Sequence, residues 1–92
     1  MKVTAHFHGI LADWVGSRSA VFELSNDATY PDLIAEIKQR FGGNMPVQLW
    51  DAEKNTFHQK VRAFRESKAL GPADVKLEQG EELTFFLMIA GG

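Results

Sequence analysis

The sequence has three histidines, and two of them, His6 and His8, stand two residues apart. They lie in a run that alternates between apolar and polar residues, so both side chains are expected on one face of a strand. Two imidazoles bind a metal ion only weakly, because structural and catalytic zinc sites use three or four protein ligands. No cluster of aspartate or glutamate accompanies the pair. We therefore expect no metal site and assign both histidines to an open, polar sheet face.

Patterns for nucleophilic catalysis and phosphate binding are missing as well. The chain has no cysteine, which excludes thiolate nucleophiles, disulfides and cysteine zinc sites. No serine stands in a GxSxG elbow. The pairs Gly42-Gly43 and Gly91-Gly92 belong to neither a GxGxxG nor a GxxxxGK phosphate loop. We therefore predict that the chain is not an enzyme and binds no cofactor of its own.

The stretch from Leu83 to Gly92 is apolar, carries no charge and finishes with two glycines. Chain ends are usually polar and frayed. Under a structural interpretation, the stretch is a central strand and the glycines have no role. Under a functional interpretation, the carboxylate of Gly92 is delivered into a narrow site, because glycine lacks a Cβ atom and adopts almost any backbone conformation. The residues alone leave both interpretations open.

The elements that position these residues begin with a strand over residues 3–7, where apolar and polar side chains alternate. Gly9 opens a connection whose apolar spacing indicates one or two helical turns, and Gly16 ends it. Strand-like composition resumes over residues 20–24. These segments predict a hairpin with a long connection.

A helix is predicted over residues 31–41. Thr29 and Asp32 fit a capping box, Pro31 suits the first turn, and Gly42-Gly43 marks the end. A single apolar stripe on this helix is expected to pack against a sheet. The stripe consists of Leu33, Ile34, Ile37 and Phe41.

Three further strands are predicted over residues 46–50, 61–64 and 82–88, which gives the order ββαβββ. A hairpin followed by a helix and returning strands makes a compact α+β roll. The prediction is a mixed sheet of four to five strands with one main helix packed on one face.

Alternation along the last strand separates two phenylalanines. Leu83, Phe85 and Leu87 are expected to face the helix. Phe86 is expected on the outer face with Met88, beside the two histidines. We therefore assign Phe85 to the core and Phe86 to a contact with a partner.

Length and composition limit the number of domains, the kinds of partner and the location of the protein. A chain of 92 residues that is 45% hydrophobic supports one core, so we predict a single domain over residues 1–92. Ten lysines and arginines against 12 acidic residues give no positive surplus, which argues against a nucleic-acid partner. No uncharged stretch approaches the ~20 apolar residues of a membrane span. The N-terminus also lacks the pattern of a signal peptide. We expect no membrane contact and a cytoplasmic location.

The segment from Val75 to Leu83 and the ending Ile89-Ala90-Gly91-Gly92 resemble the MoaD/ThiS sulfur carriers, which have the ubiquitin-like β-grasp fold. In that family an LxxGDEV turn leads into the final strand and an AGG terminus, and here the turn reads Gly80-Glu81-Glu82-Leu83. The resemblance covers nearly the whole chain, including the first hairpin and the single helix. It implies a β-grasp sulfur carrier with a flexible Gly-Gly tail.

In such carriers, a ubiquitin-activating-type enzyme uses ATP to adenylate the C-terminal carboxylate, which then becomes a thiocarboxylate. The resemblance implies that Gly92 carries the sulfur and that Gly91 gives the tail slim access. The implied partners are this adenylating enzyme and a sulfur acceptor such as the large subunit of molybdopterin synthase. We expect the partner-binding surface to comprise His6, His8, Phe86, Met88, Ile89 and Ala90.

Two departures from the family pattern leave the pathway open. Arg65-Glu66-Ser67-Lys68 replaces the asparagine-glycine turn after the fourth strand, and Leu87-Met88 replaces the proline pair of many molybdopterin-type carriers. The first hypothesis is sulfur donation in molybdopterin or tungstopterin synthesis. The alternatives are a thiazole-type carrier of thiamine synthesis, a modifier joined through Gly92 to lysines of target proteins, and a β-grasp interaction module without C-terminal chemistry.

Overall fold

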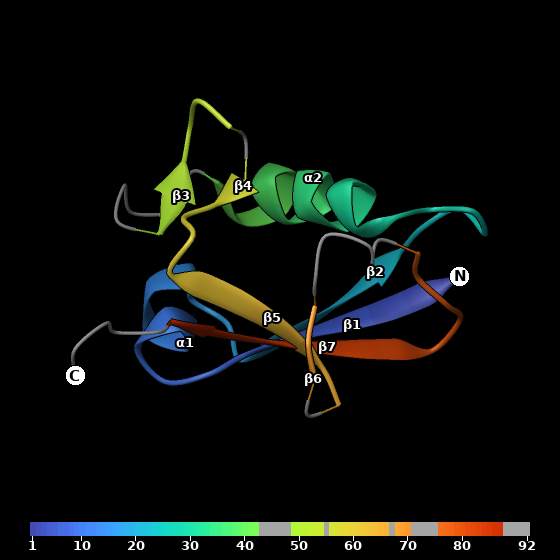
Figure 1. Cartoon of the computed structure of the whole chain (residues 1–92), viewed down its shortest axis with the longest axis horizontal. Helices are drawn as coiled ribbons and strands as arrows, with labels where there is room; N and C mark the ends of the chain where they lie inside the picture. Colours follow the sequence, from blue (N-terminus) through green and yellow to red (C-terminus); the bar gives the residue numbers. More distant parts are fainter. Residues whose placement is uncertain (43–48, 55, 67, 71–75, 88–92) are drawn as a thin grey trace.

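The computed structural model describes residues 1–42, 49–54, 56–66, 68–70 and 76–87. Two helices lie among the first strands, and only strands follow the second helix along these ranges (Figure 1). The elements are β1 (Lys2–Phe7), α1 (Ile10–Val15), β2 (Ser19–Glu23), α2 (Tyr30–Phe41), β3 (Trp50–Asp51), β4 (Thr56–Phe57), β5 (Val61–Arg65), β6 (Lys68–Ala69) and β7 (Glu81–Leu87).

The strands form a five-stranded sheet in the order β2-β1-β7-β5-β6, and β3 pairs with β4 in a separate two-stranded sheet. The neighbours β1 and β7 run parallel, whereas every other neighbouring pair is antiparallel. Helix α2 lies across one face of the larger sheet (Figure 1). This confirms the predicted α+β class, the mixed sheet and the main helix on one face. The arrangement is the β-grasp.

Helix α2 starts where the sequence predicts a cap. The Asp32 carboxylate accepts a hydrogen bond from the backbone N–H of Thr29 at 2.8 Å, which satisfies a donor at the helix start. The stripe residues Leu33, Ile34 and Ile37 are buried.

Within the described ranges, no helix is long and apolar enough to span a bilayer.

The core lies between α2 and the sheet face that α2 covers. Alternate residues of β1 and β7 point into it, and Val3, Ala5, Leu83 and Phe85 are each at most 1% exposed. The ring of Phe85 lies 5.6 Å from that of Phe7 and 5.3 Å from that of Phe57. Phe85 therefore joins the large sheet to the β3–β4 hairpin.

The structure contains more helices and strands than the predicted order ββαβββ. The helical turns after Gly9 form a separate helix, α1, and the two-residue strands β4 and β6 were not predicted. The strand predicted over residues 46–50 meets the structure only at Trp50, because Leu49 lies in a turn and residues 46–48 fall outside the described ranges. Strands of two residues are too short to show an alternating pattern in sequence.

The turn that departs from the family pattern connects β5 to β6. Its residue Glu66 has a φ of 53°, in the left-handed region. That conformation is unfavourable for a residue with a Cβ atom and is tolerated best by glycine and asparagine. The backbone at Glu66 therefore has a conformation that suits the asparagine and glycine found at this turn in MoaD/ThiS carriers.

Tyr30 opens α2 and is the only tyrosine of the chain. Its ring stacks on Phe85 with the centroids 6.5 Å apart, and burial raises the pKa of its phenol to about 12. Because unfolding returns this pKa to about 10, the contribution of Tyr30 to stability is complete below pH 10 and is lost as the pH rises through 12. We expect the ultraviolet titration of the tyrosinate to shift down in denaturant. An identical titration in folded and unfolded protein would contradict this burial.

Candidate docking site

The centre of the candidate site is the end of β7. In the register, Phe85 of β7 lies beside Phe7 of β1, so both parallel strands end at the same edge of the sheet. Helix α1 packs against β7 at this edge (Figure 1). The described part of β7 stops at Leu87, and the predicted site residues Met88, Ile89, Ala90, Gly91 and Gly92 lie outside the described ranges. Any segment that continues from β7 starts from the middle of the sheet.

Beside this point, the sheet face opposite α2 carries an aromatic cluster of His8, Phe64 and Phe86. The His8 ring lies 4.7 Å from that of Phe86, and the Phe64 ring meets Phe86 edge-on at 5.4 Å. Phe86 is half-buried within this cluster, unlike its buried neighbour Phe85. The structure thus places Phe86 and His8 together on the outer face, as their alternation predicts.

His6 lies on the same outer face, opposite Thr84 in the register as expected, and its side chain contacts a carboxylate. Its Nε2 lies 2.7 Å from Oε1 of Glu82, so His6 forms an ion pair when protonated. The two histidines therefore have separate neighbours, a carboxylate for His6 and an aromatic ring for His8. In the part of the chain that the structure describes, no three side chains of histidine, aspartate or glutamate are arranged to hold a metal ion.

Phe64 is a site residue that the sequence reasoning missed. The strand over residues 61–64 was predicted, and Val61 and Ala63 of β5 are buried. Alternation from these two residues places Phe64 on the outer face, opposite Thr84 of β7. The alternation of buried residues along β5 could therefore have identified Phe64 as an outward-facing residue.

A hollow of about 470 Å³ adjoins the aromatic cluster at the end of β1. The exposed side chains of Asp13 and Arg18 line it, and neither is paired with another side chain among the described residues. Gly9 also lines it, with a φ of 59° and a ψ of −136°, a combination that side chains strongly disfavour. The sharp change of direction at Gly9 brings α1 alongside the edge where β7 ends.

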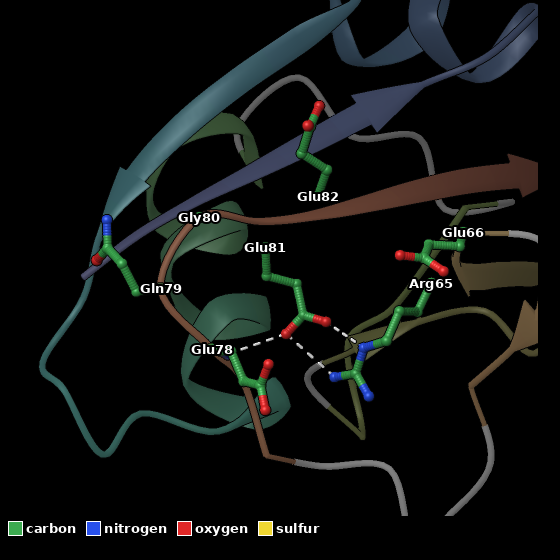
Figure 2. Close-up of a pocket in the computed structure, with 7 residues that line it drawn as sticks. All are labelled: Arg65, Glu66, Glu78, Gln79, Gly80, Glu81 and Glu82. Carbon is green, nitrogen blue, oxygen red and sulfur yellow. Dashed lines mark hydrogen bonds and ion pairs between the residues drawn. The ribbon is translucent and has the colours of Figure 1, made fainter.

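The other end of β7 is anchored by a partly buried ion pair. Both Nε and Nη2 of Arg65 donate to the Glu81 carboxylate, and the Glu81 side chain is only 7% exposed (Figure 2). Nη2 also donates to the carbonyl of Lys76 at 2.8 Å, and the backbone N–H of Glu78 donates to Glu81 at 3.0 Å. This two-pronged geometry is the strong form of an arginine–carboxylate contact.

The neighbouring turn adds a further link. Gly80, with a φ of 79°, donates its backbone N–H to the carbonyl of Lys2 at 2.9 Å. Arg65, Glu81 and Gly80 also line a hollow of about 330 Å³ (Figure 2). They tie the start of β7 to β1 and β5, and we assign them a structural role in holding β7 in register.

Comparison with solved structures shows the same fold in several small proteins. SAMP1 from Haloferax volcanii, a small archaeal modifier protein, superposes with a TM-score of 0.79 at 18% identity over all of both chains. A putative molybdopterin converting factor, subunit 1, from Pyrococcus furiosus superposes with a TM-score of 0.70 at 20% identity, covering 97% of this chain and 99% of that one.

CysO from Amycolatopsis orientalis, solved in a complex with BexX, gives a TM-score of 0.65 at 22% identity, covering 98% of this chain and 99% of the other. No protein-family model matches the sequence, and no curated protein sequence does so either. This chain therefore has the ubiquitin-like β-grasp fold of the archaeal modifiers, the molybdopterin converting factor subunit and CysO, as its resemblance to the MoaD/ThiS carriers predicts.

Proposed function

We propose that the chain is a sulfur carrier for molybdopterin or tungstopterin synthesis, with Gly92 as the residue that carries the sulfur. One observation carries the proposal: β7 lies in the middle of the sheet, parallel to β1, and ends beside the aromatic cluster. A segment continuing from β7 can enter a partner's active site while the partner rests on the outer sheet face. The fold shared with a molybdopterin converting factor subunit supports this pathway.

The chemistry requires activation of a carboxylate. The carboxylate of Gly92 attacks the α-phosphate of ATP and releases pyrophosphate, which leaves an acyl-adenylate. Hydrosulfide then adds to the acyl carbon and AMP departs with one of the original carboxylate oxygens, so the product is a thiocarboxylate. The adenylating enzyme supplies the catalytic groups, and the carrier supplies the acyl group. Because adenylation consumes ATP, we propose a cytoplasmic location.

Intact-protein mass spectrometry tests the proposal directly. The chain ending at Gly92 is incubated with a purified ubiquitin-activating-type enzyme, ATP and sulfide. We expect a mass increase equal to the replacement of one oxygen by sulfur, and no increase without ATP. A variant lacking Gly92 and a variant extended beyond Gly92 are the controls, and both should stay unmodified. Failure to form the adenylate with activating enzymes that load other β-grasp carriers, or equal loading of the extended variant, would refute the proposal.

Protein modification is the second candidate function, because SAMP1 is a modifier protein with the same fold. In this case, the acyl-adenylate is attacked by a lysine amine of a target protein instead of by sulfide. Conjugates that carry an isopeptide bond to Gly92, and that disappear when Gly92 is deleted, would favour this function over sulfur transfer.

We expect Phe86→Ala to weaken binding to the adenylating enzyme by at least ~10-fold, as is usual for an aromatic residue at the centre of an interface. Its loss from the cluster should lower the free energy of unfolding by only about 1 kcal/mol, the size of an aromatic pair contribution. Calorimetric titration and urea unfolding on the same preparations measure both effects.

The matched control is Val21→Ala, because Val21 is an apolar residue of the edge strand β2 and is 52% exposed. We expect this variant to bind like the parent protein. Equal weakening by the two substitutions would show that binding is not centred on Phe86.

A further inference from the structure

Strand β2 forms one edge of the five-stranded sheet, and no described strand pairs with its outer side. The carbonyl of Arg18 accepts from Phe7 at the end of β1, and the N–H of Leu24 donates to Met1 just before β1, each at 2.8 Å. Since backbone groups alternate along a strand, the N–H and C=O groups of Ser19, Val21 and Glu23 point away from β1. Such an edge is a template for pairing with another strand.

Two side chains already donate hydrogen bonds to backbone carbonyls on this edge. Nη1 of Arg40, in the last turn of α2, donates to the carbonyl of Val21 at 3.0 Å. Oγ of Ser17 donates to the carbonyl of Ser19 at 2.7 Å. The guanidinium carbon of Arg40 also lies 4.2 Å from the centre of the Phe22 ring, a cation–π contact that holds Arg40 over the strand. The middle of the edge is therefore closed by a helix side chain.

The edge is complementary to itself. In an antiparallel pair centred on Val21, the Val21 side chains of two copies face each other, and Ser19 faces Glu23 of the second copy. No like charges stand opposite each other, which would destabilise the pair. Pairing would also cover the Val21 side chain, which among the described residues is one of two large apolar side chains that are exposed. A second copy of this chain therefore fits the edge.

We propose that the outer edge of β2 is a pairing surface for β2 of a second copy of this chain, and that Arg40 keeps it closed. Pairing needs the carbonyl of Val21 as an acceptor for the backbone N–H of the second copy, and Arg40 already uses that carbonyl. Because Val21 lies on the two-fold axis of the pair, the arginines of both copies would also meet there and repel each other. The wild-type chain is thus a monomer, and removal of Arg40 permits a dimer with a continuous sheet.

Sedimentation velocity over a concentration series tests this inference with Arg40→Leu. We expect the wild type to keep the mass of one 10.3 kDa chain throughout, and the variant to approach twice that mass at high concentration. Arg62→Leu is the control, because it makes the same change of charge on the exposed side of β5. This control should stay monomeric. Arg40→Gln provides a second variant if the leucine impairs folding, which thermal unfolding reports.

The double variant Arg40→Leu/Val21→Lys identifies the surface. Two lysines would then face each other on the axis, so the dimer should dissociate. In the Arg40→Leu dimer, the amides of Ser19, Val21 and Glu23 should exchange with deuterium more slowly than in the monomer. A wild type that already dimerises, folded Arg40 variants that stay monomeric, or a dimer that survives Val21→Lys would each overturn the inference. None of these readouts depends on Gly92, so they are independent of the proposed sulfur chemistry.

Discussion

Phe85→Ala should lower the free energy of unfolding by about 3–5 kcal/mol, the usual cost of truncating a buried phenylalanine. The ring is 1% exposed and touches residues from three directions: Phe7 in the sheet, Phe57 in the small hairpin and Tyr30 at the start of α2. Since these contacts join separate elements, the surroundings have little freedom to close the space left by the ring. Urea unfolding of the variant measures the loss.

Phe86→Ala is the matched control, because it removes the same side chain from the next residue of the same strand. The two positions differ in the face that they occupy and in their burial. A similar loss of stability in both variants would contradict the division of β7 into a core face and an outer face.

Gly91→Val should leave thermal unfolding unchanged and reduce sulfur transfer by roughly tenfold or more, the effect of ~1.4 kcal/mol on a rate. The five residues after Leu87 can span at most about 16–18 Å, which is enough for a carboxylate to enter a partner's active site. A β-branched side chain next to that carboxylate restricts the backbone and widens the segment that must pass.

Gly91→Ala is the graded control, and we expect a smaller reduction from its single methyl group. Thiocarboxylate formation, followed by mass spectrometry, and transfer to the acceptor are measured on the same preparations. Unchanged loading and transfer in Gly91→Val would show that no narrow channel accepts this residue.

Local patterns predicted the parts of the fold that depend on neighbouring residues. The capping pair Thr29 and Asp32 places the start of α2 within one residue, and the stripe on the helix identifies its buried side. Alternation in β7 separates Phe85 from Phe86 correctly. The small strands β4 and β6 escaped prediction because two residues show no period, and pairing with a neighbouring strand is what makes them extended.

The contacts that escaped prediction join residues far apart in sequence. His6 meets Glu82 across 76 residues, and Arg65 meets Glu81 across 16. A charged residue in a sequence has many possible partners, and only the register of neighbouring strands selects one. The side of the sheet on which His6 lies was predictable, whereas its carboxylate partner depended on the parallel pairing of β1 with β7.

The parallel pairing of β1 with β7 also determines when this protein can fold. Strand β1 is made first, yet its parallel neighbour β7 begins only at Glu81, just after Gln79, whose side chain accepts a hydrogen bond from Lys2 across 77 residues. During synthesis, the hairpin of β1 and β2 and the helix α2 emerge from the ribosome without the strand that holds the middle of the sheet. Closing so long a loop is a slow step in folding. Completion of the core and placement of β7 beside β1 are thus one event, so a partner that binds the outer sheet face at the end of β7 finds that face only on chains that have finished folding.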